Sequence, residues 1–519
     1  MKSHLIAIVK TITAGCLLFM FSKTEAADYN IRDFGALPDG KTIATASIQK
    51  AINQCSREGG GRVMIPTGKF LTGMLALKDN VELHLERGAV LWGSASKDDY
   101  GTSKGEKALI TAYEVINAAL SGEGEIDGNG RAFLKGDNAP DRPVLISFKR
   151  SKKISITGIT LKNSAFWGLH LLYDEDVVID RIHIYSHANF NNDGIDIDSR
   201  NVTISNCVID TDDDGICFKS DSPFICENVT VTNCVIASNC NFIKMGTASA
   251  GGFKNIAVSN CALRRASESN FRFWNKKNLG VIDSISGLAG IALEVVDGGA
   301  MDRISISNIT MEGVQTPVFM RLGSRSHPTG SLRNIIISNI IARACSPIPS
   351  SITAVPGFYV DNVTLRDIFI EAPGMAGPHD AAPTIPENEK AYPENRMFGA
   401  TLPAYGLFVR HVKNLTIDNL VLQLQHEDSR SALYFSDATQ IKIDQLQAPA
   451  LKNTSPVIMC DATKNLSISG YIAPGVIPLF LHLRDARTSR ILLVNNDWNG
   501  VQKIYTRNAE VAPNAIMQK

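Results

Sequence analysis

Several features that would narrow the class of this protein are missing from its 519 residues. Lysine plus arginine and aspartate plus glutamate both number 52, so the formal net charge is zero, and the basic face of a nucleic-acid binder is not expected. After the first residues no apolar run is long enough to cross a membrane. The cysteines form no Cys-x-x-Cys pair and no His-Glu-x-x-His is present, so zinc centres of these kinds are not expected.

The N-terminal residues have the pattern of a secretion signal. Lys2 and Lys10 precede an apolar run from Ile12 to Phe21, and a small-residue cleavage site ends at Ala26. We therefore expect residues 1–26 to be a signal peptide and the mature chain to be periplasmic or secreted. We expect a cap with the first coils at 27–95, continuous with a body at 96–519.

An internal repeat is the strongest signal in the sequence. Two apolar residues separated by one recur after a polar residue, and Asn or Asp commonly follows. The first apolar position of each copy falls at Ile154, Val177, Val202, Val229, Ile256, Ile304, Ile335, Val363, Leu415, Ile441 and Leu466. Alternation with period two predicts short strands, and strands spaced so regularly are expected to stack into a solenoid. The pattern predicts an all-β fold, a right-handed parallel β-helix, in which each unit is one coil. The two long steps, 256 to 304 and 363 to 415, mark a degenerate coil or an insertion.

Three further segments fit this architecture. Residues 43–57 carry a helical apolar stripe, which predicts an amphipathic helix that caps the open end of the solenoid. The segment 373–403 interrupts the repeat and is expected to be a loop that shapes one wall of a cleft. Cys207, Cys234 and Cys261 recur every 27 residues, which favours buried, reduced thiols over a disulfide network.

The densest acidic region predicts the chemistry. Asp193-Gly194-Ile195 and Asp214-Gly215-Ile216 superimpose with a separation of 21 residues, roughly one coil, so both carboxylates should stack about 5 Å apart. Asp213 should point to another side of the bend. Carboxylates this close repel one another, and one can stay protonated at neutral pH, as glycoside hydrolysis requires. Aspartate-rich bends in solenoids also cap turns or bind Ca²⁺, so that alternative stays open.

The chain resembles glycoside hydrolase family 28, the polygalacturonase family, from about Tyr29 through the last repeats. Its motifs include Asp33-Phe34-Gly35-Ala36, Gly59-Gly60-Gly61 and Ile126-Asp127-Gly128. The family's Asn-x-Asp-Gly and Asp-Asp motifs match Asn191, Asp193, Asp213 and Asp214. The resemblance implies that Asp213 is the general acid, that Asp193 and Asp214 activate water, and that configuration is inverted.

Two family motifs are changed in this sequence. Asn241 stands in place of the histidine of Gly-His-Gly, and Ala292-Leu293-Glu294 stands in place of Arg-Ile-Lys. In polygalacturonases that Arg and Lys bind the galacturonate carboxylate, so homogalacturonan is a doubtful substrate here.

The remaining substrate-binding candidates, with Asn191, are Asn241, Lys219, Lys244, Glu294, Trp167 and Arg272. We expect a monomer that acts on pectic polysaccharide or oligosaccharide, galacturonan or rhamnogalacturonan, with no cofactor, no metal, no nucleic acid and no membrane contact. Two rival functions remain at this point: a Ca²⁺-dependent polysaccharide lyase, and a non-catalytic glycan-binding solenoid.

Overall fold

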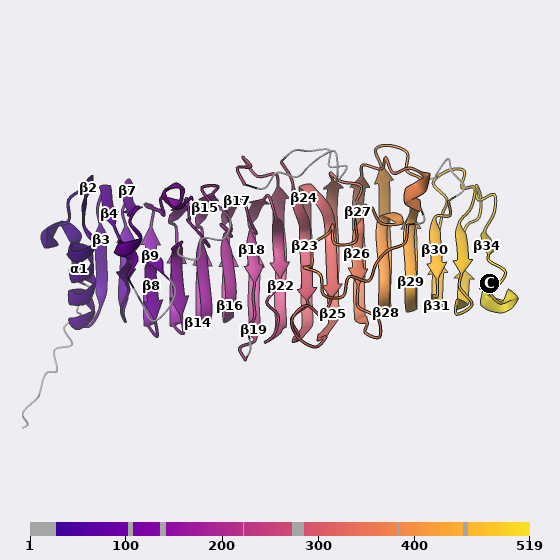
Figure 1. Cartoon of the computed structure of the whole chain (residues 1–519), viewed down its shortest axis with the longest axis horizontal. Coiled ribbons are helices and arrows are strands. Elements are labelled where there is room, and N and C mark those ends of the chain that lie inside the picture. The colour runs from indigo at the N-terminus through magenta and orange to yellow at the C-terminus, as the bar shows by residue number, and fades with distance from the viewer. Residues whose placement is uncertain are drawn as a thin grey trace, which may run out of the picture.

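The computed structural model describes residues 27–101, 107–134, 142–221, 223–271, 285–381, 383–399, 401–449 and 455–519. The expected signal peptide, residues 1–26, and the candidate Arg272 lie outside these ranges. Within them the chain is a parallel β-helix, as predicted. Its coils follow one another from the N-terminal to the C-terminal end of one long stack (Figure 1).

Strand pairing divides the coils into three parallel sheets. The first, here the repeat sheet, contains β1 (Ala27–Asn30), β3 (Gly61–Ile65), β6 (Val81–Leu85), β9 (Ile116–Gly122), β12 (Lys152–Thr157), β19 (Cys226–Thr232), β31 (Lys464–Ser469), β33 (Ser489–Val494) and β35 (Ile516–Gln518). The second, here the site sheet, contains β5 (Leu75–Ala76), β8 (Ala108–Tyr113), β11 (Val144–Lys149), β18 (Ile216–Phe218), β21 (Asn241–Met245), β23 (Gly287–Val295), β26 (Ser350–Thr353), β30 (Ile458–Asp461), β32 (Leu481–Arg484) and β34 (Tyr505–Arg507).

The third sheet contains β2 (Asp39–Ile43), β4 (Gly68–Thr72), β7 (Ala89–Gly93), β10 (Glu125–Asp127), β13 (Thr160–Lys162), β15 (His183–Ser186), β17 (Val208–Thr211) and β20 (Val235–Ser238). Long strands continue from one sheet into another: β14 (Leu169–Asp180), β16 (Ile195–Ser205), β22 (Phe253–Arg264), β24 (Ala300–Leu322), β25 (Ser331–Ala344), β27 (Val360–Ala372), β28 (Ala404–Leu424) and β29 (Ser431–Gln447). Short 3-10 helices are η1 (Ile31–Phe34), η2 (Lys97–Tyr100), η3 (Gly130–Phe133), η4 (Pro378–Ala381) and η5 (Pro513–Ala515).

The register of the repeat sheet confirms the repeat read from the sequence. Each predicted apolar position pairs directly with the next one, from Ile154 opposite Val177 through Ile441 opposite Leu466. Ile256 faces Ile304 without an intervening coil, and Val363 faces Leu415 in the same way. Both long steps are therefore insertions in a single coil. All these side chains are buried, and burying one such side chain stabilises a fold by roughly 1.5–3 kcal/mol.

An asparagine stack, here the asparagine edge, runs along the outside of the repeat sheet. It consists of Asn201, Asn228 and Asn255, one on each successive coil, each with a left-handed φ of 56° or 57°. The side-chain amide of Asn228 donates to the Oδ1 of Asn201 at 3.0 Å, and Asn255 donates to Asn228 at 2.8 Å. Asparagine suits this position because it tolerates the left-handed conformation and because each amide hydrogen-bonds the next.

The N-terminal end is covered as expected. Helix α1 (Thr45–Arg57) buries Ile48, Ala51, Ile52 and Cys55, whereas Ile43 ends strand β2 and is exposed, so the helix begins two residues later than predicted. The nine cysteines of the described chain are free and buried, as predicted for Cys207, Cys234 and Cys261. None of the described helices is long and apolar enough to span a membrane.

Candidate active site

A cleft of about 760 Å³ lies where β16, β18, β21 and β23 begin, on the outer side of the site sheet. Eight of the ten residues predicted for the site line it: Trp167, Asn191, Asp193, Asp213, Asp214, Lys219, Asn241 and Lys244. Of the other two, Glu294 is buried behind the lining, and Arg272 is outside the described residues.

The coil geometry places the cleft residues in register. The backbone N–H of Gly194 donates to the carbonyl of Asp214 at 2.9 Å, and Ile195 pairs with Ile216. The predicted superposition of the two Asp-Gly-Ile segments is therefore confirmed. Gly215 donates in turn to the carbonyl of Asn241 at 2.8 Å, so Asn241 occupies the same position one coil further on.

Asp214 is held as an ionised carboxylate. Its Oδ2 lies 3.0 Å from the ammonium of Lys244, and its Oδ1 accepts from the side-chain amide of Asn241 at 2.8 Å and from the Asn241 backbone at 3.0 Å. Burial alone would raise the pKa of Asp214, but Lys244 and Lys219 outweigh burial and hold that pKa well below its usual range.

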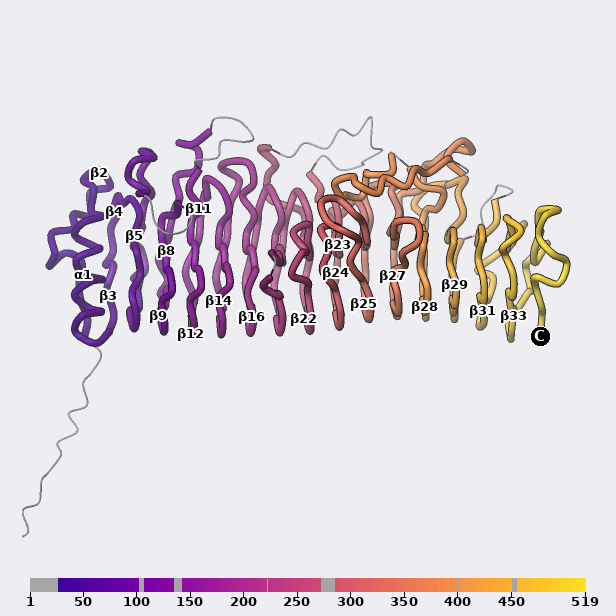
Figure 2. The backbone as a smooth tube through the Cα atoms, turned by 60° about the horizontal axis from the view of Figure 1, so that its bottom comes forward, coloured from indigo at the N-terminus to yellow at the C-terminus, as the bar shows by residue number. Residues whose placement is uncertain are grey.

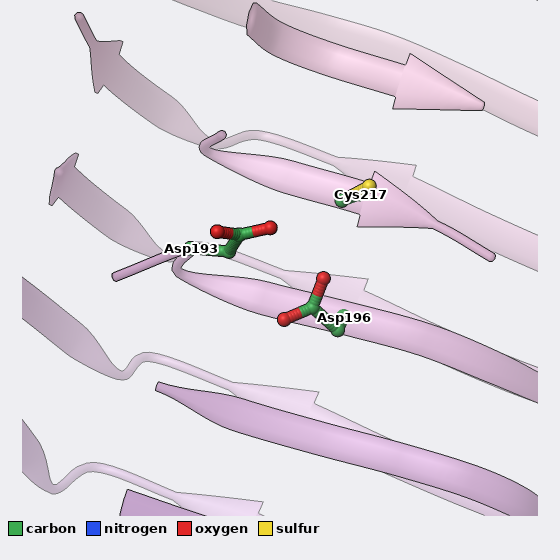
Figure 3. Close-up of side chains that lie close together, drawn as sticks. All are labelled: Asp193, Asp196 and Cys217. Carbon is green, nitrogen blue, oxygen red and sulfur yellow. The ribbon is translucent and has the colours of Figure 1, made fainter. Parts of the chain in front are cut away.

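A second carboxylate pair shares one ammonium. The Nζ of Lys219 lies 2.8 Å from the Oδ1 of Asp196 and 3.4 Å from the Oδ2 of Asp193. Figure 3 shows Asp193 at the bend, Asp196 on the strand that follows, and Cys217 on the neighbouring strand. Burial and the charge of Asp196 raise the pKa of Asp193 well above its usual range, and burial raises the pKa of Asp196 despite the nearby Lys219 ammonium.

Sequence reasoning missed Asp196, although a signal was present. Ile195 and Ile197 pack into the core, so the alternation of strand β16 turns Asp196 outward.

Asp193, Asp196 and Cys217 form a group of potential ligands for a cation. The atoms of Asp193, Asp196 and Cys217 lie within 4.8 Å of one another, but the Lys219 ammonium already binds both carboxylates. Burial also raises the pKa of the Cys217 thiol, so these residues suit a bound ion poorly.

Asp213 is fixed through its backbone and lines the cleft. Its N–H donates to the Oδ1 of Asn192 at 3.0 Å, and its Oδ1 accepts from the N–H of Asp214 at 3.0 Å. Asn192 is itself tied to the carbonyl of Ser186 at 2.7 Å. Asp213 is therefore held by polar contacts on two coils.

The comparisons with known proteins identify the family. Residues 55–376 match the profile of Glycosyl hydrolases family 28. The chain belongs to this family. The suspected resemblance is thus confirmed for more than half of the sequence.

Relatives of this family 28 chain include a "Probable polygalacturonase" of Vitis vinifera, which is 33% identical over an alignment of 220 residues; the match covers 38% of this chain and 45% of the relative. The "Exo-poly-alpha-D-galacturonosidase" of Dickeya chrysanthemi is 30% identical over an alignment of 251 residues, and the match covers 36% of this chain and 41% of the relative. The chain thus spans less than half the length of these curated relatives.

Solved structures confirm the fold of the family 28 chain. An exopolygalacturonase from Thermotoga maritima has a TM-score of 0.61 and 21% identity, with 76% of this chain and 92% of the other covered. The family 28 exopolygalacturonase of Yersinia enterocolitica has a TM-score of 0.55 and 18% identity, with 80% and 78% covered.

The segment 373–403 forms one wall of the family 28 cleft, as the sequence indicated. Tyr392, Pro393, Glu394 and Arg396 line the cleft. The insertion, orange in Figure 2, runs lengthwise along the outside of the coils. Tyr392 reaches the ammonium of Lys244 through its hydroxyl at 3.4 Å, so the wall is in direct contact with the site sheet.

Two buried arginines of the site sheet hold this wall in place. Arg321 on β24 donates to the carbonyls of Glu387 at 2.8 Å and Asn388 at 3.2 Å. Arg410 on β28 donates to the carbonyls of Ile385 at 2.9 Å and Pro386 at 2.8 Å. Both arginines therefore hold the insertion through its backbone, and the buried side chain of Asn395 adds a hydrogen bond to the carbonyl of Leu288 at 3.2 Å.

A buried charged cluster includes Asp212, the residue immediately before Asp213. His187 lies between two buried aspartates, with Nε2 2.9 Å from Asp210 and Nδ1 3.5 Å from Asp212. Burial would lower the pKa of His187, but the two carboxylates outweigh burial and raise it to about 9. Asp212 also accepts from the N–H groups of Asn270 at 2.9 Å and Phe271 at 3.0 Å. Asp212, the residue before Asp213, thus binds the loop that follows β22 by two backbone hydrogen bonds.

Ala292 and Glu294, which stand in place of the family's Arg and Lys, lie on strand β23 next to the strand that carries Lys244. Ala292 pairs with Lys244, and Glu294 pairs with Arg321 on the next strand. Glu294 is 1% exposed and neither of its carboxylate oxygens has a hydrogen-bond partner among the described residues. Burial raises the pKa of Glu294 to about 8.

Proposed function

We propose that the chain is a glycoside hydrolase that cleaves glycosidic bonds in pectic polysaccharide with inversion of configuration. The supporting observation is the trio Asp193, Asp213 and Asp214 on one cleft, where neighbouring groups drive carboxyl pKa values apart. Inverting hydrolysis needs one carboxyl that retains a proton and one that is ionised. In this proposal Asp213 protonates the leaving oxygen, and Asp193 and Asp214 orient and deprotonate the attacking water.

The electrostatics of the cluster support this division. Asp214 is kept ionised by Lys244 and Asn241, which suits a group that accepts a proton from water. Burial, together with the charges of Asp196 and Asp213, raises the pKa of Asp193 well above its usual range, so the carboxyl cluster holds a proton at a pH where isolated carboxyls are ionised. A retained proton beside the scissile oxygen is what the acid step uses.

The charge state of Lys219 and Lys244 favours hydrolysis over lysis. A lyase needs a neutral amine or a comparable base to remove a proton from the sugar. The carboxylates around Lys219 and Lys244 outweigh burial and raise both lysine pKa values well above the usual range. Both lysines therefore stay charged and serve as counter-ions.

The test compares wild type with Asp213→Asn on homogalacturonan and rhamnogalacturonan. Reducing ends report cleavage, absorbance of unsaturated sugars reports lysis, and proton NMR of the first product reports its anomeric form. We expect reducing ends without unsaturation, initial product of inverted configuration, and a fall in kcat of about 10²- to 10⁴-fold in the variant.

Asp418→Asn is the matched control, because Asp418 lies on the repeat sheet and pairs with Arg366 at the surface. This variant should keep wild-type activity. Unsaturated products, or an Asp213→Asn enzyme as active as wild type, would refute the proposed mechanism. Binding of glycan without any cleavage by wild type would instead identify a non-catalytic solenoid.

A further inference from the structure

We propose that the part of the cleft lined by Lys244, Gly246 and Tyr392 takes an uncharged sugar and that Glu294 is the residue that determines this specificity. This inference rests on the proposed glycan-cleaving function and names the chemistry of one of its subsites. The sugar is recognised by its hydroxyl groups, and a uronate carboxylate at this position is disfavoured.

The lysines that border this subsite are already neutralised by the protein. Lys244 is bound to Asp214, and Lys219 is bound to Asp193 and Asp196. A uronate would have to compete with these buried carboxylates for the same ammonium groups. Displacing a buried partner leaves it as an uncompensated charge, which is strongly unfavourable.

The arginines of the cleft are also engaged. Arg396 is paired with Glu394 on the wall. Arg142 donates to the carbonyl of Ala165 at 3.0 Å and to the Oδ1 of Asn191 at 2.9 Å. Among the described lining residues the bases are Arg142, Lys219, Lys244 and Arg396, and the acids are Asp193, Asp213, Asp214, Asp221 and Glu394. The described lining therefore has no excess of basic groups before substrate arrives.

Glu294 is a further acidic residue near the cleft, and Gly246 lies between it and the cleft surface. Gly246 lines the cleft and is the neighbour of Glu294 on the preceding coil. A Cβ added to Gly246 would lie 2.9 Å from the Cβ of Glu294 and 2.3 Å from its carbonyl oxygen. The missing side chain leaves the Glu294 carboxyl close behind the cleft surface.

The unpartnered state of this carboxyl indicates a use for it. Both oxygens lack hydrogen-bond partners among the described residues, and buried polar groups of native proteins are rarely left so. With its pKa raised to about 8 by burial, Glu294 is a neutral acid at pH 6 to 7, able to donate one hydrogen bond and to accept others. Such a group can bind a sugar hydroxyl, but it provides no positive charge for a carboxylate.

The experiment measures binding, so that it does not depend on cleavage. Calorimetry with Asp213→Asn compares galacturonan oligosaccharides with the same oligosaccharides after carboxyl reduction, which converts each carboxylate to a neutral CH₂OH. We expect the reduced oligosaccharide to bind at least 10-fold more tightly at pH 7. The preference should grow from pH 7 to 9, because Glu294 becomes charged and repels the uronate more strongly.

Added substitutions assign this preference to Glu294. With Asp213→Asn and Glu294→Gln combined, the side chain stays neutral, and the preference should no longer change between pH 7 and 9. Ala292→Arg with Glu294→Lys should reverse the preference toward the uronate. Glu312→Gln, at an exposed position, is the control and should leave the preference and its pH dependence unchanged.

Equal or tighter binding of the uronate would overturn the inference, and so would a pH dependence that survives Glu294→Gln. Failure to bind the reduced oligosaccharide would overturn it too. The proposed hydrolase function fails by a separate result, namely cleavage that is absent in wild type or indifferent to Asp213→Asn.

Discussion

On consecutive coils Asn201, Asn228 and Asn255 repeat along one side, while Asp193, Asp214 and Asn241 repeat along another. The asparagines form a neutral and exposed stack in which every amide hydrogen-bonds the next. The cleft carboxylates are buried, repel one another and depend on two lysines for compensation. Stacking of equivalent residues on successive coils thus gives amides that satisfy one another's hydrogen bonds. The same stacking of carboxylates gives a frustrated cluster, in which like charges repel one another. Frustration kept in this way is typical of functional sites.

Removing the compensating charge should give the largest effect. Lys244→Met leaves the buried Asp214 without its ammonium, and loss of one partner of a buried pair costs about 3–5 kcal/mol. We expect a matching drop in the free energy of unfolding, measured with urea.

Lys413→Met is the matched control, since Lys413 pairs with Asp361 at 3.3 Å in a partly exposed position. Exposed pairs contribute about 0–1 kcal/mol. Similar losses for both lysines would mean that burial of the cleft does not matter.

Replacing a cleft carboxylate with a neutral amide should raise the free energy of unfolding. The raised pKa of Asp193 means that the folded state binds more protons than the unfolded state between about pH 4 and its folded pKa. Wild-type stability therefore falls as pH rises through this window. Asp193→Asn lacks the charge, and we expect it to be more stable by about 0.5–2 kcal/mol at pH 8 while losing activity.

Thermal unfolding at pH 4 and pH 8 measures this difference. The gain should be present at pH 8 and nearly absent at pH 4, where the unfolded carboxyl is also half protonated. A variant less stable than wild type at pH 8 would show that the pair with Lys219 outweighs the repulsion.

Breaking the asparagine edge should have the smallest effect. Asn228→Ala removes hydrogen bonds to Asn201 and Asn255, and one such bond is worth about 0.5–1.5 kcal/mol. Asn228→Gly loses the same bonds but adopts the left-handed backbone easily, so it separates the two causes. We expect a lower urea midpoint for both variants, with alanine the lower. Unchanged midpoints would indicate that the edge adds no stability.

The sequence was sufficient for much of the fold because strand alternation and coil spacing are local signals. The eleven apolar positions and the Asp193 and Asp214 superposition followed from counting residues. The start of α1 was misplaced because Ile43 has the apolarity of the helix stripe but ends β2. Arg142 and His187 were missed because their partners lie on other coils, at separations that no local pattern encodes. The position of Glu294 beside Gly246 likewise depends on the neighbouring coil.

Arg321 and Arg410 grip the insertion by four main-chain oxygens, which every amino acid possesses. The path of that segment is consequently set largely by the scaffold, and only a few of its side chains, such as the buried Asn395, add contacts to the coils. Exposed residues of the insertion such as Glu389 and Lys390 can then be exchanged without redesigning the coils beneath. The molecule thereby separates what must persist through evolution from what can diversify, and an engineer can use the insertion as a replaceable cassette.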